Sequence, residues 1–156
     1  MTCGKVHEYL GMTIDLSQKG KVIISIIGYI LKMFSLLPEK IQQDISKGKT
    51  TPSSENLFTV NEENPVKLSE KDRVLVHSST ARLLFLGKRA RPDVQTPVAF
   101  LCTRVKVSDE DDSKKLERVM GYLYGTLYIS LILGTDNSGN IYCWKDGAHA
   151  VHQYMK

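Results

Sequence analysis

The sequence predicts a chain of the α+β class, with a β-hairpin at each end and a group of helices between them. Three observations carry this prediction. Short stretches near both ends are rich in β-branched and aromatic residues, whereas the middle repeats apolar residues at steps of three and four. The chain of 156 residues, 42% of them hydrophobic, is also long enough to bury a core and too apolar for general disorder.

A hairpin followed by a helix is predicted for residues 1–37. Leu10, Met12 and Ile14 alternate with less apolar neighbours, which is the period of a strand with one apolar face. The polar stretch LSQKGK predicts the turn, and VIIS predicts the second strand. The spacing then becomes helical, and Pro38 ends the pattern. One face of this helix carries Ile26, Ile30, Met33 and Phe34.

Residues 38–67 are predicted to form a linker over the surface. They are polar, contain Pro52 and Pro65, and show a helical pattern only briefly, around Ile41 to Ile45. We expect the part from Lys47 to Val66 to be loosely held.

Two amphipathic helices are predicted on either side of GKRARP, residues 87–92. The first begins near Ser69, and the second follows Arg91, with Pro92 suited to a first helical position. Pro97 would remove a hydrogen bond inside the second helix, so we expect either a kink or a late start at Thr96. The apolar faces comprise Val76, Leu83 and Leu84 in the first helix, and Val94, Val98, Leu101, Cys102 and Val105 in the second.

A further helix and a second hairpin are predicted to complete the chain. Ser108 offers an N-cap, and the acids of SDEDD favour the positive end of the helix dipole. This helix ends near Gly125. The stretch LYISLIL, the turn GTDNSGN and the strand IYCWK predict the hairpin, and Asp146 follows directly. The buried stripe of the helix comprises Leu116, Val119, Met120 and Leu123.

Charge, cysteine content and hydropathy limit the class of protein only broadly. A net charge of +4 permits an acidic partner such as nucleic acid without requiring one. Three scattered cysteines form neither a disulfide framework nor paired zinc spacing, which favours an intracellular setting, cytoplasmic or nuclear. No secretory signal is visible, and the apolar stretch 22–37 is short for a membrane span and contains Lys32, so no membrane partner is expected.

Basic clusters are the clearest candidate binding residues. Such groups bind phosphates by releasing counterions, without recognising bases. A solvated face, or a helix C-terminus where cations are favoured, explains them equally well. The candidates are Lys88, Arg89 and Arg91 at the GKRARP corner, and Lys114, Lys115 and Arg118 on the later helix.

No complete catalytic or metal site is predicted from the residues alone. Asp146 follows a strand, where an acid is usually solvent-exposed, and one carboxylate cannot hold two divalent ions. His149 and His152, near Cys143, lack a fourth zinc ligand, so we interpret them as surface histidines. The motifs of serine hydrolases and of phosphate-loop enzymes are absent from the sequence.

Four stretches carry a family resemblance when they are taken in order. They are YLGM at Tyr9, Leu10, Gly11 and Met12, then TARLLFLGKRARPD at 80–93, LERVMGYLYGT at 116–126 and DGAHAVH at 146–152. Together they resemble the later part of the reverse transcriptase of copia-type retrotransposon polyproteins. YLGM is similar to that family's primer-gripping hairpin, and the next two stretches to its helix-turn-helix segment and to the helix before RNase H. DGAHAVH resembles the first RNase H strand, with Asp146 at the place of the first metal-binding acid.

The resemblance implies four parts of a polyprotein fragment. Residues 1–37 would be the end of the polymerase palm, with a primer-grip-like hairpin and the following helix. Residues 38–67 would be a linker, 68–126 a helical thumb and connection segment, and 127–156 a truncated start of the RNase H domain.

The resemblance also implies a function. The chain would support template-primer binding in RNA-directed DNA synthesis, with nucleic acid, bound weakly, and the remainder of the polyprotein as partners. The polymerase's paired aspartates are absent from these residues, and Asp146 would be an RNase H acid without its companions. The isolated chain is therefore expected to be inactive and to need no cofactor, whereas Mg²⁺ serves the full-length parent. The alternative is a non-catalytic nucleic-acid-binding or interaction protein derived from a retroelement.

Overall fold

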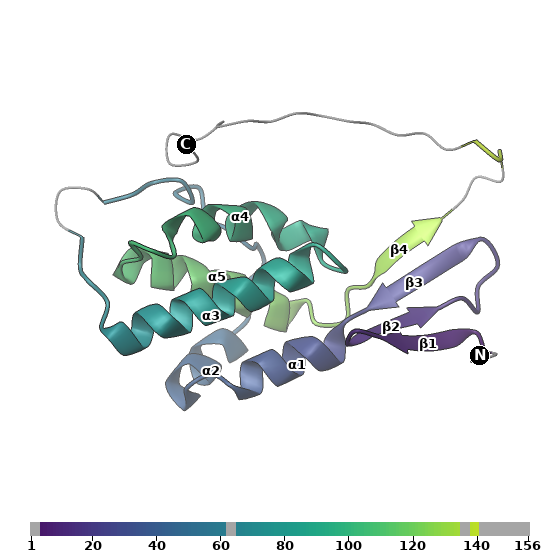
Figure 1. Ribbon diagram of the computed structural model, residues 1–156, viewed down its shortest axis with the longest axis horizontal. Coiled ribbons are helices and arrows are strands. Elements are labelled where there is room, and N and C mark those ends of the chain that lie inside the picture. The colour runs from purple at the N-terminus through teal and green to yellow at the C-terminus, as the bar shows by residue number, and fades with distance from the viewer. Residues whose placement is uncertain (1–3, 62–64, 135–137, 141–156) are drawn as a thin grey trace.

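The computed structural model describes residues 4–61, 65–134 and 138–140, and it confirms a mixed α+β fold. One antiparallel sheet lies beside a group of helices, and helices and strands do not alternate along the chain (Figure 1). In chain order the elements are β1 (Val6–Tyr9), β2 (Met12–Asp15), β3 (Lys21–Ser25), α1 (Ile27–Ser35), α2 (Glu39–Ser46), α3 (Glu70–Gly87), the 3₁₀ turn η1 (Pro92–Val94), α4 (Gln95–Arg104), α5 (Glu110–Gly125) and β4 (Leu131–Gly134).

The sheet has the strand order β1, β2, β3, β4, and each strand is antiparallel to the next. β2 and β3 form the predicted first hairpin, although Leu10, predicted for its first strand, lies in the turn before β2. β4 joins the free edge of β3, with Val22 opposite Leu133. The sequence does not predict β1, which adds an edge strand before β2. The strand predicted at 141–145 lies outside the described residues, so of the expected C-terminal hairpin only β4 is seen.

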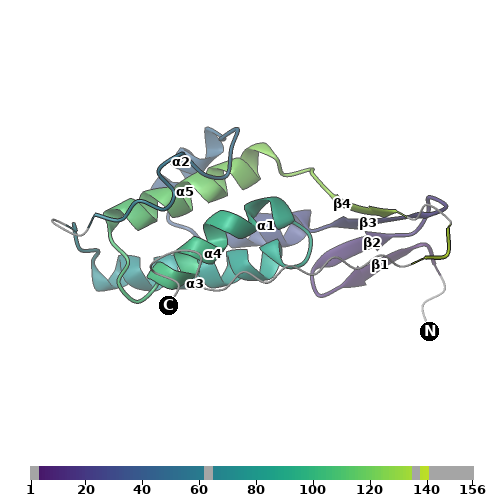
Figure 2. The ribbon, with the colours of Figure 1, turned by 90° about the horizontal axis from the view of Figure 1, so that it is seen from above.

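One face of the sheet is apolar and enters the core at one end only. Met12 and Ile26 are 7% and 2% exposed. Leu16 and Leu133, which strand alternation places on the same face, are 44% and 49% exposed. The sheet therefore extends outward from the helical part of the molecule (Figure 2).

The helices α3, α4 and α5 pack together as predicted, and α2 packs on α5. The residues predicted for the apolar faces of α1 and α5 are all buried. Helix α4 begins at Gln95 after the turn η1, so Pro97 stands in the first helical turn, where an N–H has no partner within the helix. The late start, rather than a kink, thus accommodates this proline. Within the described residues, no helix combines the length and apolar character needed to cross a membrane.

Part of the predicted linker is held against the helices, so the expectation of a loosely held stretch is wrong for residues 48–59. The linker contains α2, whose Ile45 is buried, and Leu57 beyond it is only 5% exposed. The amide of Lys49 donates a hydrogen bond to the carbonyl oxygen of Gly121 at 3.1 Å. A glycine permits this approach, because a Cβ atom at position 121 would lie 3.1 Å from Cγ of Lys49. The domain boundaries stay predictions.

The N-cap of α5 is Asp109, not Ser108 as predicted. The Asp109 carboxylate accepts a hydrogen bond from the Asp112 amide at 2.9 Å, and the Asp112 carboxylate accepts one from the Asp109 amide at 3.2 Å. This reciprocal capping box satisfies two N–H groups that a helix start leaves unpaired. Both residue types are good caps, so only the backbone position of the first helical turn decides between them.

Candidate nucleic-acid interface

The turn between β1 and β2 contains Tyr9, Leu10, Gly11 and Met12, the four residues that the sequence predicts to be primer-grip-like. Tyr9 and Leu10 are 59% and 55% exposed, whereas Met12 is buried. Leu10 and Gly11 have φ angles of 50° and 78°, which is the left-handed pair that a two-residue hairpin turn requires. A leucine in this region costs about 1–2 kcal/mol. Because local strain of this kind is typical of functional positions, the exposed Leu10 is a candidate binding residue.

Tyr29 of α1 connects this turn to α3. A Cβ atom at Gly11 would lie 3.7 Å from Cδ2 of Tyr29, so the turn backbone lies against the ring. The ring stacks on Phe85 of α3, with centroids 5.0 Å apart and an interplanar angle of 29°. The Tyr29 hydroxyl donates to the carbonyl oxygen of Arg82 at 3.4 Å. Burial raises the pKa of Tyr29, and the positive charge of Arg82 opposes this rise.

Lys88 and Arg89 are exposed at the end of α3. The guanidinium carbon of Arg89 lies 4.4 Å from the centroid of the Phe85 ring, a favourable cation–π distance. Phe85 therefore contacts both Arg89 and Tyr29, and Tyr29 lies next to the turn. The fold brings together two groups that are far apart in the sequence, the primer-grip-like turn and the exposed part of the GKRARP corner.

Arg91 does not belong to this exposed surface. It is 0% exposed, and its guanidinium donates to the Asp93 carboxylate, to the Thr126 carbonyl oxygen at 2.9 Å and to Thr126 Oγ1 at 2.7 Å. The Tyr122 hydroxyl donates to the same Asp93 carboxylate at 2.9 Å. Arg91 thus joins η1 to the end of α5, and in this arrangement it does not present its guanidinium to a phosphate.

The ionisation of Asp93 gives a pH test of this network. Burial would raise the Asp93 pKa, but hydrogen bonds from Arg91 and Tyr122, together with the charge of Arg91, hold it below the ordinary value of 3.8. A carboxyl group whose pKa is lowered in the folded state stabilises the fold at pH values above its ordinary pKa. This contribution is lost as the pH falls through the folded-state pKa. We expect Asp93→Asn to reduce the free energy of unfolding near neutral pH, and the difference from wild type to shrink below about pH 4. Urea unfolding across this range measures it, and a pH-independent difference would contradict the network.

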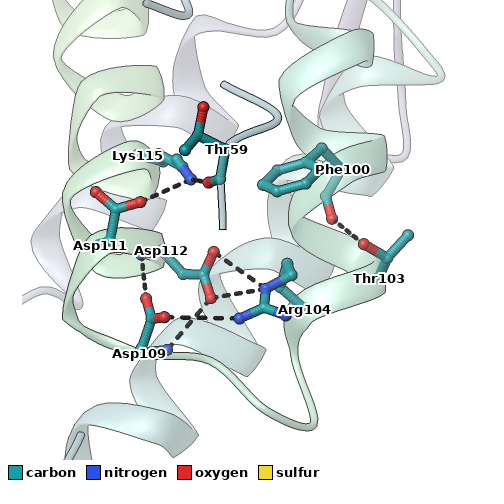
Figure 3. A network of polar contacts seen from close by, with 8 residues as sticks. All are labelled: Thr59, Phe100, Thr103, Arg104, Asp109, Asp111, Asp112 and Lys115. Carbon is teal, nitrogen blue, oxygen red and sulfur yellow. Dashed lines mark hydrogen bonds and ion pairs between the residues drawn. The ribbon is translucent and has the colours of Figure 1, made fainter. Parts of the chain in front are cut away.

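The Lys115 side chain is also buried and bound by other residues of the chain. It is 8% exposed, and its Nζ donates to the Thr59 carbonyl oxygen at 2.5 Å and pairs with Asp111 at 2.7 Å (Figure 3). The Nζ also lies 5.1 Å from the ring centroid of Phe100. Lys115 therefore fastens the segment after α2 to α5, and it is not available as a phosphate contact in this arrangement.

The other two predicted cations on α5, Lys114 and Arg118, line a groove of about 770 Å³ between α2, α5 and the segment after α2. Lys114 pairs with Glu110 at 3.4 Å, and Arg118 donates to Thr51 Oγ1 at 2.8 Å. Acidic side chains balance the basic ones around this groove, so its charge gives no preference for an anion. The basic lining residues are Lys47, Lys49, Lys114, Lys115 and Arg118, and the acidic lining residues are Asp44, Asp109, Glu110, Asp111 and Glu117.

The acids at the start of α5 are engaged with Arg104. Arg104 Nε donates to Asp112 at 3.1 Å, and a second guanidinium nitrogen pairs with Asp109 at 3.6 Å (Figure 3). Burial raises the pKa of Asp112, Arg104 opposes this rise, and the nearby Asp109 charge adds to it. These carboxylates satisfy a helix start and a buried arginine, so they do not fit a metal site. In the described residues, no group of three or more His, Cys, Asp or Glu side chains is placed to hold a metal ion.

Several predicted residues fall outside the described part of the chain, and their roles stay predictions. They are Asp146, His149, His152 and Cys143.

Two residues of the candidate interface, Tyr29 and Phe85, are missing from the sequence-based prediction. In the sequence each residue lies beside the apolar stripe of its helix rather than on it. Tyr29 precedes Ile30, and Phe85 follows Leu84. An aromatic residue beside a helical stripe is the available signal, but it does not indicate which element the ring contacts.

A comparison with curated proteins places the chain next to a transposon product. Over 96% of its length, the chain is 29% identical to a Saccharomyces cerevisiae protein described as "Putative transposon Ty5-1 protein". It spans 46% of that protein's length. This similarity supports a retrotransposon origin. No family model matches the chain, and no solved structure matches it.

Proposed function

We propose that this chain is a nucleic-acid-binding segment of a copia-type retrotransposon polyprotein and supports template-primer binding in its reverse transcriptase. The observation that carries the proposal is the contact series from Gly11 through Tyr29 and Phe85 to Arg89. It unites an exposed, strained hairpin turn with exposed cations in one surface. The similarity to a transposon protein is consistent with this proposal.

The two halves of this surface supply different interactions. Lys88 and Arg89 contribute positive charge, which binds phosphates by releasing counterions whatever the base sequence. The turn offers Tyr9 and Leu10, whose apolar and aromatic surface suits sugars and base faces. The surface therefore fits a nucleic-acid strand that is bound weakly and without sequence preference.

Catalysis belongs, under this proposal, to the longer polyprotein. Asp146 is the first RNase H acid, and Mg²⁺ is held only when further acids join it, because one carboxylate cannot hold two divalent ions. The isolated chain therefore performs neither DNA synthesis nor RNA cleavage.

The binding surface is tested by Lys88→Ala with Arg89→Ala in one variant. We expect weaker binding of a fluorescently labelled primed template, and a salt dependence whose slope falls by about 0.9 for each phosphate contact removed. Fluorescence anisotropy at several salt concentrations measures both quantities.

The matched control is Lys71→Ala with Lys106→Ala, which removes the same charge from two exposed lysines away from the α3 C-terminus. The control should retain most of the salt slope. An unchanged slope in Lys88→Ala with Arg89→Ala, or an equal fall in the control, would reject this surface as the site.

A further inference from the structure

Tyr29 lies between the two halves of the candidate interface. Gly11 in the turn lies next to the Tyr29 ring, and the same ring stacks on Phe85, which carries Arg89 over its face. Tyr29 itself is half-buried and belongs to α1, which follows β3 directly. Its ring therefore lies beside the turn and contacts α3.

The need for such a contact follows from the shape of the molecule. The β1–β2 turn lies at the end of the sheet that meets the helices, whereas the rest of the sheet extends outward from them (Figure 2). A change in how this end of the sheet packs on α1 would therefore alter the separation between the turn and the end of α3. Two weak binding groups contribute most to the affinity when the protein holds them at a fixed separation, because the second contact is then made at a high effective concentration.

We propose that Tyr29 is a positioning residue that holds the β1–β2 turn and the basic end of α3 together, so that they bind one nucleic-acid strand as a unit. This inference rests on the proposed function. The ring, rather than the hydroxyl, performs the positioning. The aromatic stack is close, with centroids 5.0 Å apart, whereas the hydrogen bond to Arg82 is long at 3.4 Å.

The test is a double-mutant cycle between the two halves, repeated with different residues at position 29. Leu10→Asn removes the apolar side chain from the turn but keeps a residue that tolerates positive φ. Arg89→Ala removes the cation over Phe85. Binding of the labelled primed template is measured for both single variants and the double variant, with Tyr29, with Tyr29→Phe and with Tyr29→Leu.

With Tyr29, Arg89→Ala should weaken binding about threefold more when Leu10 is present than when position 10 is Asn. Tyr29→Phe should preserve this ratio, because the ring remains. Tyr29→Leu fills much of the same space without an aromatic stack, and the ratio should fall to about one. Urea unfolding of each protein is measured separately, because a purely structural role would change stability without changing the ratio.

The outcomes separate this inference from the function on which it rests. If Arg89→Ala leaves the affinity and the salt slope unchanged, the proposed binding surface itself fails. If Arg89→Ala weakens binding but the ratio is one with Tyr29, or persists with Tyr29→Leu, the surface stands and the positioning role of Tyr29 is overturned.

Discussion

Arg91→Ala is expected to lower the free energy of unfolding by about 3 kcal/mol, because it breaks a buried ion pair by removing one partner. The guanidinium is 0% exposed, and the Asp93 carboxylate and both Thr126 oxygens would lose its hydrogen bonds together. The Thr126 carbonyl oxygen would be left without this donor. Because the Asp93 side chain is 31% exposed and keeps access to water, we expect a loss near the lower limit for buried pairs.

Arg89→Ala is the matched control for this prediction, since Arg89 is an exposed arginine two positions earlier. Its effect on the free energy of unfolding should stay within about 1 kcal/mol, the size of an exposed cation–π contact, while it weakens nucleic-acid binding. Arg91→Lys should recover only part of the loss, because one ammonium group cannot replace a planar fork that reaches Asp93 and Thr126 at once. Urea unfolding measures all three variants. A loss below about 1 kcal/mol for Arg91→Ala would show that the network contributes little.

Asp112→Ala is the second substitution for which we expect a large effect, again about 3 kcal/mol of unfolding free energy. The Asp112 side chain is 2% exposed, and Arg104, which it pairs with, is 10% exposed. Removing the carboxylate takes one ion pair from Arg104, which keeps its pair with Asp109 at 3.6 Å, and it opens the capping box of α5. Loss of a cap alone costs about 1 kcal/mol, so most of the effect comes from the buried arginine.

Asp111→Ala is the control, because Asp111 is the adjacent acid and its side chain is 52% exposed. It loses the exposed pair with Lys115 and one acid of the first helical turn, so it should cost clearly less than Asp112→Ala. Thermal and urea unfolding followed by circular dichroism compare the two. Equal losses would mean that the Arg104 network does not govern the stability of α5.

The first of these predictions concerns a charged residue that the sequence presents as a candidate for binding. Arg91 stands in the GKRARP cluster beside Lys88 and Arg89, and all three look alike in the sequence. In the fold, only Lys88 and Arg89 are exposed, and Arg91 is fully buried. Charge patterns identify candidates, but partners from distant elements decide which charges remain available to a ligand.

The helices were the most predictable elements. The stripes at Ile26, Ile30 and Met33 and at Leu116, Val119 and Leu123 are buried, because a repeat of three and four residues puts a whole face toward one neighbour. The elements that the sequence missed lack such a repeat. β1 precedes a turn with Leu10 where a glycine or asparagine is expected, so its hairpin carries no recognisable turn signal.

The sequence by itself determined the α+β class, the apolar faces of the main helices and the first hairpin, because these depend on periodicity along a continuous stretch. Only the tertiary structure decided which cations are exposed, that part of the linker is fastened to α5, and that Tyr29 joins the turn to α3. The physical reason is that burial and ion pairing are properties of surfaces in contact. Arg91 contacts Thr126, and Lys115 contacts Thr59, only after the helices have packed, so no local sequence pattern can predict those contacts.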